Sequence, residues 1–281
     1  MANGAGFFTL KECSESAPKT PPTVISYSDQ PYAWFPLKQI LMKDFEQQTI
    51  LITGAGFDIG RALSLQCAQM GAHVILMDKD NRALNSIYDE IVAAQYCEPT
   101  ILKLPAEELA GETAELVRQQ ILNDHQHLDA LINTADAAFP LTPANLLDTE
   151  VLDRALHTLH SLPHQVTREL FPVLKLAKRP SIIFTSHFSA HTHKSYWGYH
   201  AGAFAALEAL ARQWAADTQN LGFSVNSIDP GPVATAVRKK HYPAEDTSHL
   251  RDPSHGGILS LYLNLLRREG KTRNGEHFSL T

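Results

Sequence analysis

Short apolar runs alternate with longer, often alanine-rich segments along most of the chain, from residue 42 onward. The runs are bounded by polar residues or glycines, as buried strands of a parallel sheet are; they are Thr49–Ile52, His73–Met77, Thr100–Leu104, Ala130–Asn133, Ser181–Thr185, Ser224–Ile228 and His277–Leu280. The segments between them predict helices at Arg61–Met70, Arg82–Ala94, Thr113–Asn123, Glu150–Leu170, Gly198–Thr218 and His255–Arg268. Strict alternation predicts a single α/β domain: a doubly wound parallel sheet of about seven strands with helices on both faces.

The first 41 residues depart from this pattern. Residues 1–30 are rich in Ser, Pro, Thr and Gly and hold few large apolar side chains. We therefore expect residues 1–41 to form an N-terminal extension that is largely disordered or loosely packed. The predicted domain covers residues 42–281.

Composition narrows the class of protein. Of the 281 residues, 44% are hydrophobic and 19% are charged, which is typical of a chain that buries a substantial core. The net charge of −6 argues against a nucleic-acid partner. No apolar run approaches the length of a membrane span, and the N-terminus lacks the features of a signal peptide. The three cysteines have unrelated spacings. We expect a cytoplasmic protein with no membrane partner.

A glycine-rich loop follows the first predicted strand. Residues 53–60 have the sequence TGAGFDIG and lead into a predicted helix. Glycines at this point let the backbone pass close to a pyrophosphate at the helix N-terminus. Asp78 ends the second strand, 18 positions after Gly60. A carboxylate there accepts the ribose hydroxyls of NAD and repels the 2′-phosphate of NADP. Asp78 could instead only open a turn, but its spacing favours the cofactor role and makes NADP less suitable than NAD.

With two further motifs, this loop resembles the short-chain dehydrogenase/reductase family over about residues 42–281. The family's TGxxxGxG loop is matched at Thr53, Gly54 and Gly60, its NNAG motif appears as NTAD at residues 133–136, and its VNxIxPGxVxT segment is similar to residues 225–235. The resemblance implies a Rossmann-like fold of oxidoreductase lineage. The residues that it assigns to the cofactor are Gly54, Gly56, Ile59, Gly60, Asp78, Asn133, Ala135, Pro230, Gly231, Val233 and Thr235.

Two carboxylates depart from the family's pattern. Asp58 stands at the family's middle glycine, and Asp136 replaces the glycine of NNAG. A carboxylate beside a pyrophosphate costs electrostatic energy unless it turns away or caps the helix. We therefore expect weakened dinucleotide binding.

The family's catalytic pattern is incomplete. In the family a Tyr transfers a proton while a Lys four residues on lowers its pKa; here Tyr199 has Ala203 at the lysine position. Counting back 13 residues from Tyr199 gives Ser186 for the family's serine, whereas counting from the strand gives His187. The family's asparagine aligns with Leu159. A tyrosine with a pKa near ~10 is a poor acid or base at neutral pH. The candidate catalytic residues are Tyr199, Ser186 and His187.

Histidines offer a replacement. The chain has 14, and those expected near the substrate cleft are His187, His191, His193 and His200. Imidazoles hold zinc or act as general bases, but polar side chains at loop ends are an equally ordinary role for them. Without Cys or carboxylate partners at ligand spacing, we expect no metal site. His187 or His200 remains a candidate substitute acid/base.

Three functions stay open. The protein is an active NAD-dependent oxidoreductase with a substitute acid/base, an NAD(H)-binding protein with weak or no standard carbonyl or alcohol turnover, or an inactive partner of an active relative. The joint loss of the lysine, the asparagine and the loop glycines favours the second. The polar segment Val237–Ser254, a substrate lid in the family, predicts a polar or small ligand of unknown identity. The alanine-rich segment Gly198–Thr218 predicts pairing into a homodimer or homotetramer.

Overall fold

One parallel sheet flanked by helices accounts for the described residues, which in this computed structural model are 24–27, 44–267 and 273–280. The strands are β1 (Val24–Tyr27), β2 (Thr49–Thr53), β3 (His73–Asp78), β4 (Thr100–Lys103), β5 (Ala130–Asn133), β6 (Ser181–Thr185), β7 (Ser224–Asp229) and β8 (His277–Leu280). The helices are α1 (Asp58–Gln69), α2 (Asn81–Ala93), α3 (Gly111–His125), α4 (Thr149–Leu156), α5 (Leu162–Leu174), α6 (Ser189–Thr192), α7 (Gly198–Thr218), α8 (Ala236–His241) and α9 (Gly256–Leu266).

The strand order is β1-β8-β7-β6-β5-β2-β3-β4, with every neighbouring pair parallel. All seven predicted strands are present, each within one residue of its predicted bounds, and the predicted α/β fold is confirmed. The eighth strand, β1, lies in the segment expected to be a loose extension and pairs with β8, Val24 opposite His277. The rest of that extension and the predicted boundary at Met42 lie outside the described residues.

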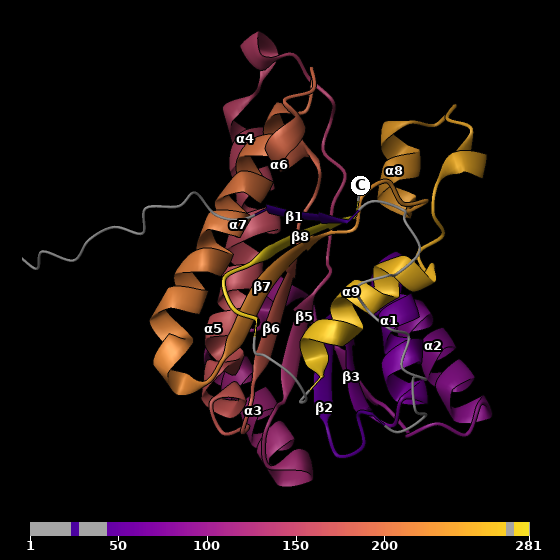
Figure 1. The fold of residues 1–281 in the computed structure, drawn as a ribbon, viewed down its shortest axis with the longest axis vertical. Coiled ribbons are helices and arrows are strands. Elements are labelled where there is room, and N and C mark those ends of the chain that lie inside the picture. Colours follow the sequence, from indigo (N-terminus) through magenta and orange to yellow (C-terminus); the bar gives the residue numbers. More distant parts are fainter. Residues whose placement is uncertain (1–23, 28–43, 268–272, 281) are drawn as a thin grey trace, which may run out of the picture.

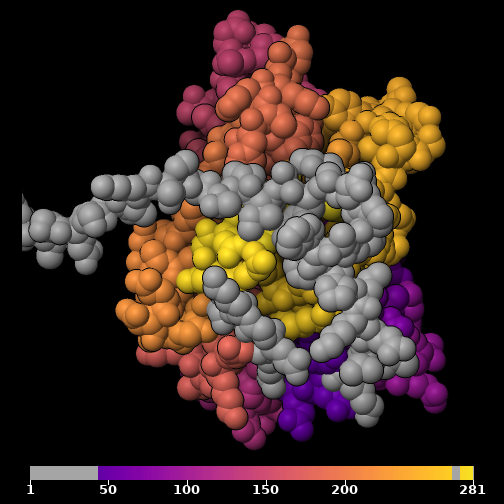
Figure 2. Space-filling view, viewed as in Figure 1, coloured from indigo at the N-terminus to yellow at the C-terminus, as the bar shows by residue number. Residues whose placement is uncertain are grey.

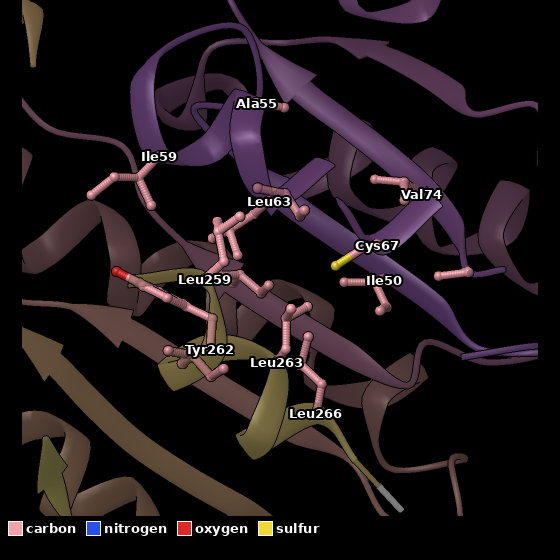
Figure 3. Close-up of a cluster of buried hydrophobic side chains, with 14 of the residues drawn as sticks. Ile50, Ala55, Ile59, Leu63, Cys67, Val74, Leu259, Tyr262, Leu263 and Leu266 are labelled. Carbon is pink, nitrogen blue, oxygen red and sulfur yellow. The ribbon is translucent and has the colours of Figure 1, made fainter. Parts of the chain in front are cut away.

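Helices cover both faces of the sheet (Figure 1). The α3, α5 and α7 helices lie on one face, and α1, α2 and α9 lie on the other. Successive strand residues point to opposite faces, so Ile50 and Ile52 pack towards α1 and α9 while Leu51 packs towards the other layer. In the first layer, apolar side chains of α9 such as Leu263 meet those of α1 such as Leu63 (Figure 3).

The predicted helix Glu150–Leu170 is divided. A π-helical turn, η3 (His157–Ser161), separates α4 from α5. Pro163 lies at the start of α5 and has no amide hydrogen to donate to Leu159, so the regular hydrogen-bond ladder is interrupted there. The chain accommodates the interruption with one wide turn. This turn contains Leu159, the residue that aligns with the family's asparagine.

The segment that contains α8 stands out from the surface beside the carboxyl ends of the strands (Figures 1 and 2). It follows β7 and carries the polar side chains predicted for a lid. Among the described helices, none is long and apolar enough to cross a membrane.

Candidate functional site

A cleft of about 670 Å³ lies at the carboxyl ends of the central strands. Residues that end β2, β3, β5 and β6 all line it. Because β2 lies between β3 and β5, the chain order reverses at this point, where ligands of doubly wound sheets bind. Ten of the eleven residues assigned to the cofactor line this cleft; Gly56 does not.

The loop after β2 is held by close backbone approaches. Gly54 has φ +65°, a conformation that disfavours residues with a Cβ. A Cβ at Gly60 would lie 2.2 Å from the Gly54 carbonyl oxygen, so only glycine fits there. Thr134 joins this loop to the end of β5, since its hydroxyl donates to the Thr53 carbonyl at 2.5 Å. These contacts bring the N-terminus of α1 to the cleft, where it offers backbone N–H groups to an anion.

Asp78 is bound to the same loop. Its Oδ2 accepts from the Gly56 N–H at 3.3 Å, and its Oδ1 accepts from the Asp80 N–H at 3.0 Å. The carboxylate opens the turn before α2 and also lines the cleft, and its role towards a cofactor stays a prediction. Gly56 contributes by donating to Asp78.

Asp58 lies at the start of α1 with φ +45°, a strained backbone conformation that Asp tolerates better than most residues. Its carboxylate does not cap α1. Instead, Oδ2 accepts from the N–H of Ala236, the first residue of α8, at 3.0 Å. Burial raises the pKa of Asp58, while the Ala236 hydrogen bond opposes that shift. The carboxylate thus spans the cleft between the glycine-rich loop and α8.

Asp136 adds a second carboxylate to this part of the cleft. Its side chain lines the cleft and is exposed to solvent there, and partial desolvation by the surrounding protein raises its pKa to about 6. A hydrogen bond from the Ala137 N–H lowers the pKa, and the negative charge of Asp58 raises it further. The region that would hold a pyrophosphate therefore contains two coupled acidic groups.

The α7 helix directs Tyr199 away from the cleft. Tyr199 is 2% exposed and does not line the cleft; its hydroxyl accepts from the Asp148 N–H at 2.7 Å. Ala203 is fully buried in the core. The α7 side chain that lines the cleft is Phe204, whereas His200, one turn before it, is buried and does not line the cleft. His200 and Phe204 are four residues apart, as the family's Tyr and Lys are, but only Phe204 reaches the cleft.

Ser186 lies at the cleft, but its hydroxyl is directed elsewhere. It donates to Glu208 Oε1 at 2.5 Å, and both side chains are buried. His187 is therefore the side chain after β6 that reaches the reaction end of the cleft. Its Nδ1 accepts from the Ser189 N–H at 3.2 Å, which leaves the ring proton on Nε2.

Aromatic and imidazole rings form the wall of this reaction chamber. His187 lies 5.0 Å from Trp197 and 5.4 Å from Phe204 between ring centroids, and His241 lies 4.7 Å from His200. Burial, followed by repulsion from neighbouring positive charges, lowers the pKa of His187 to about 3 and that of His200 to about 4. Both rings are therefore neutral at physiological pH. Sequence reasoning missed Trp197, Phe204 and His241 as parts of this wall.

His200 lies behind the wall and does not itself line the cleft. It is 1% exposed, and its Nε2 accepts a 3.4 Å hydrogen bond from the Phe139 N–H. Its Nδ1 is buried and has no hydrogen-bond partner in the part of the chain that the structure describes. Leu159 is buried in the core, so it offers no polar group to a proton relay.

The two halves of the cleft differ in how they suit a nicotinamide dinucleotide. Asp78 and the glycine-rich loop suit an adenosine and the start of a pyrophosphate, whereas the two carboxylates oppose its charge. A bound nicotinamide would supply hydride transfer. The chamber beside it holds neutral rings where a proton donor with a neighbouring cation would be needed.

The fold and this cleft define a dinucleotide-binding protein of the Rossmann type. The model of the short chain dehydrogenase family matches residues 48–246, and the chain belongs to that family. It is 27% identical to the uncharacterised oxidoreductase YciK of Escherichia coli K12 over 241 residues, which cover 86% of this chain and 93% of that protein.

Solved structures agree with this assignment. A short chain dehydrogenase of Shigella flexneri 2a, complexed with NADP, superposes with a TM-score of 0.79 at 26% identity over 85% of this chain and 98% of its own. One from Pseudomonas syringae superposes with a TM-score of 0.80 at 27% identity, over 85% of this chain and 96% of its own. The protein is therefore of oxidoreductase lineage with a dinucleotide-binding fold.

Proposed function

We propose that this protein binds NAD(H) and has weak or no standard carbonyl or alcohol turnover. The observation that carries the proposal is the chamber wall on α7. Phe204 reaches the cleft where the family places a lysine, and the Tyr199 hydroxyl is engaged by Asp148 away from it. No Lys or Arg is therefore available from α7 to lower the pKa of a proton donor at the nicotinamide.

The preference for NAD rests on Asp78. Its carboxylate lines the cleft at the carboxyl end of β3, where a ribose would lie. A 2′-phosphate would place like charges together there, whereas free ribose hydroxyls can donate to it. The Shigella flexneri relative holds NADP, so the preference of this chain has to be measured.

Titration of the full chain with NAD, NADH, NADP and NADPH, followed by Trp fluorescence or calorimetry, tests binding. We expect NAD to bind more tightly than NADP, and Asp78→Ala to narrow the difference. Equal affinities that do not respond to Asp78→Ala would contradict the assignment. Nicotinamide absorbance with a panel of aldehydes, ketones and alcohols tests turnover. Rapid native turnover would contradict the second half of the proposal.

A second candidate function is an active dehydrogenase that uses His200 in place of tyrosine. It is favoured by one observation: His200 is one turn from Phe204 and carries a buried Nδ1 without a described partner. This function requires the rings of Trp197 and His241 to move aside. It predicts native turnover that is abolished in His200→Gln, whereas the first proposal predicts little turnover in either protein.

A further inference from the structure

A cluster outside the cleft brings together two histidines and a buried carboxylate. His191 on α6, Glu208 on α7 and His277 on β8 each offer a ligand atom, and the three atoms lie within 4.8 Å of one another. His191 Nε2 is 2.9 Å from Glu208 Oε2, and His277 Nδ1 is 3.7 Å from Glu208 Oε1. Ligands around one tetrahedral zinc ion are about 3.3 Å apart, since each lies about 2.0–2.2 Å from the metal. These two separations bracket that value, and the third lies within 4.8 Å.

Charge in this cluster is poorly compensated by protein alone. Glu208 is 2% exposed, and its ion-pair partners in the described ranges are the two histidines. A second carboxylate, Asp229, is also buried. Buried carboxylates of this kind are usually paired with a cation or coordinate a metal.

The surrounding hydrogen bonds are of the kind that orient metal ligands. The Ser186 hydroxyl donates to Glu208 Oε1 and holds the carboxylate in place. Such outer partners fix the orientation of ligating side chains. The third ligand, His191, has a side chain that is 43% exposed, so an ion has a path from solvent.

We propose that His191, Glu208 and His277 form a zinc-binding site. Two imidazoles, one carboxylate and an open fourth position are a donor set that suits Zn²⁺. The bound ion balances the charge of Glu208 and ties α6 and α7 to β8. Because α6 begins two residues after His187, zinc binding also steadies one wall of the reaction chamber. The carboxylate partner that the sequence spacing did not reveal comes from α7, 17 residues after His191.

The test uses the full chain, freed of metal with a chelator and titrated with Zn²⁺ against a chromophoric competitor. We expect one tightly bound zinc ion per chain. His191→Asn should weaken binding about 100-fold or more, because losing a ligand costs at least as much as losing an outer partner. The matched control is His193→Asn, an exposed histidine two residues on, which should bind like the native chain. Ser186→Ala should weaken binding roughly 10- to 100-fold.

Two further measurements separate a metal site from a simple ion pair. Co²⁺ should give visible absorption bands of a tetrahedral ion in the native chain and not in His191→Asn. Zinc should raise the Tm of the native chain but not that of Glu208→Gln, which keeps the side-chain shape and loses the charge. Equal zinc affinity in the native chain and His191→Asn, or no zinc-dependent rise in the native Tm, would overturn the proposal in favour of a protonated His191–Glu208 pair.

Discussion

Asp58 should limit dinucleotide affinity, and replacing it with glycine should tighten binding. Its carboxylate spans the cleft from the first turn of α1 to the N–H of Ala236. A bound pyrophosphate carries about two negative charges close to this position. At about 6 Å and an effective dielectric of about 40, the repulsion amounts to roughly 2–3 kcal/mol. Allowing for salt screening, Asp58→Gly should lower the Kd for NAD by roughly 30-fold, or about 2 kcal/mol.

The substitution should change stability little. Losing the hydrogen bond to Ala236 costs about 1 kcal/mol, whereas glycine relieves the strain of φ +45° by roughly 1 kcal/mol. Asp58→Asn is the matched control, because asparagine also tolerates this conformation and keeps an oxygen to accept from Ala236. If charge is the cause, Asp58→Asn should recover most of the gain.

Calorimetric titration with NAD at low and high salt measures the effect. The gain in both variants should shrink as salt rises. Native binding should also tighten as pH falls from 7.5 to 5.5, because Asp136, with a pKa of about 6, loses its charge in that range. If Asp58→Asn binds NAD no more tightly than the native chain, the electrostatic reasoning is refuted, and a gain in Asp58→Gly alone would point to backbone freedom instead.

Three further predictions concern α7. The double variant His200→Tyr/Phe204→Lys should have higher carbonyl turnover than either single variant, because the two groups act as a unit. Ala203→Lys should only destabilise the protein, by about 3 kcal/mol or more, because it buries a charge. The pKa of His200 in the folded protein, about 4, is below its unfolded value, so the stability that its neutral form contributes is lost as the pH falls below about 6.5. Urea unfolding at pH 7 and pH 5 should show that the free energy of unfolding falls by about 2 kcal/mol less in His200→Gln than in the native chain. Light scattering should give a dimer or tetramer that Ala209→Glu, on the exposed side of α7, converts to monomers.

The strands and helices could be predicted because buried segments follow a simple pattern of apolar and polar positions in the sequence. Each central strand is an uninterrupted apolar run, and glycines or polar residues mark its ends. The segment around Val24 has no such context, since an edge strand is recognised only by its partner, which here is β8, about 250 residues later. Pro163 indicates that the predicted helix is interrupted, but not that a π-helical turn accommodates the interruption.

The tyrosine motif predicts Tyr199 at the reaction site, whereas the structure directs its hydroxyl to Asp148, away from the cleft. Tyr199, Ala203 and Leu207 recur every four residues and form one buried stripe that packs into the core. One residue later along the helix, Phe204 lines the cleft, while His200 is buried behind the cleft wall. Continuing the apolar stripe of α7 back to Tyr199 would have placed its hydroxyl at a neighbouring helix, where Asp148 begins α4.

The motifs that carry the family resemblance are needed for packing as much as for chemistry. Gly60 must remain glycine because the Gly54 carbonyl lies against it, whatever the cleft contains. The polar positions have no such packing role, and they are the positions that differ from the family's motif. This chain has carboxylates where phosphates would bind, and rings where a tyrosine and a lysine would react. The retained glycines are therefore evidence for the fold, whereas Asp58 and Phe204 are the residues on which the proposed function rests. Because these two departures lie at opposite ends of the cleft, we expect Asp58→Gly to act on dinucleotide affinity and the double variant His200→Tyr/Phe204→Lys to act on turnover.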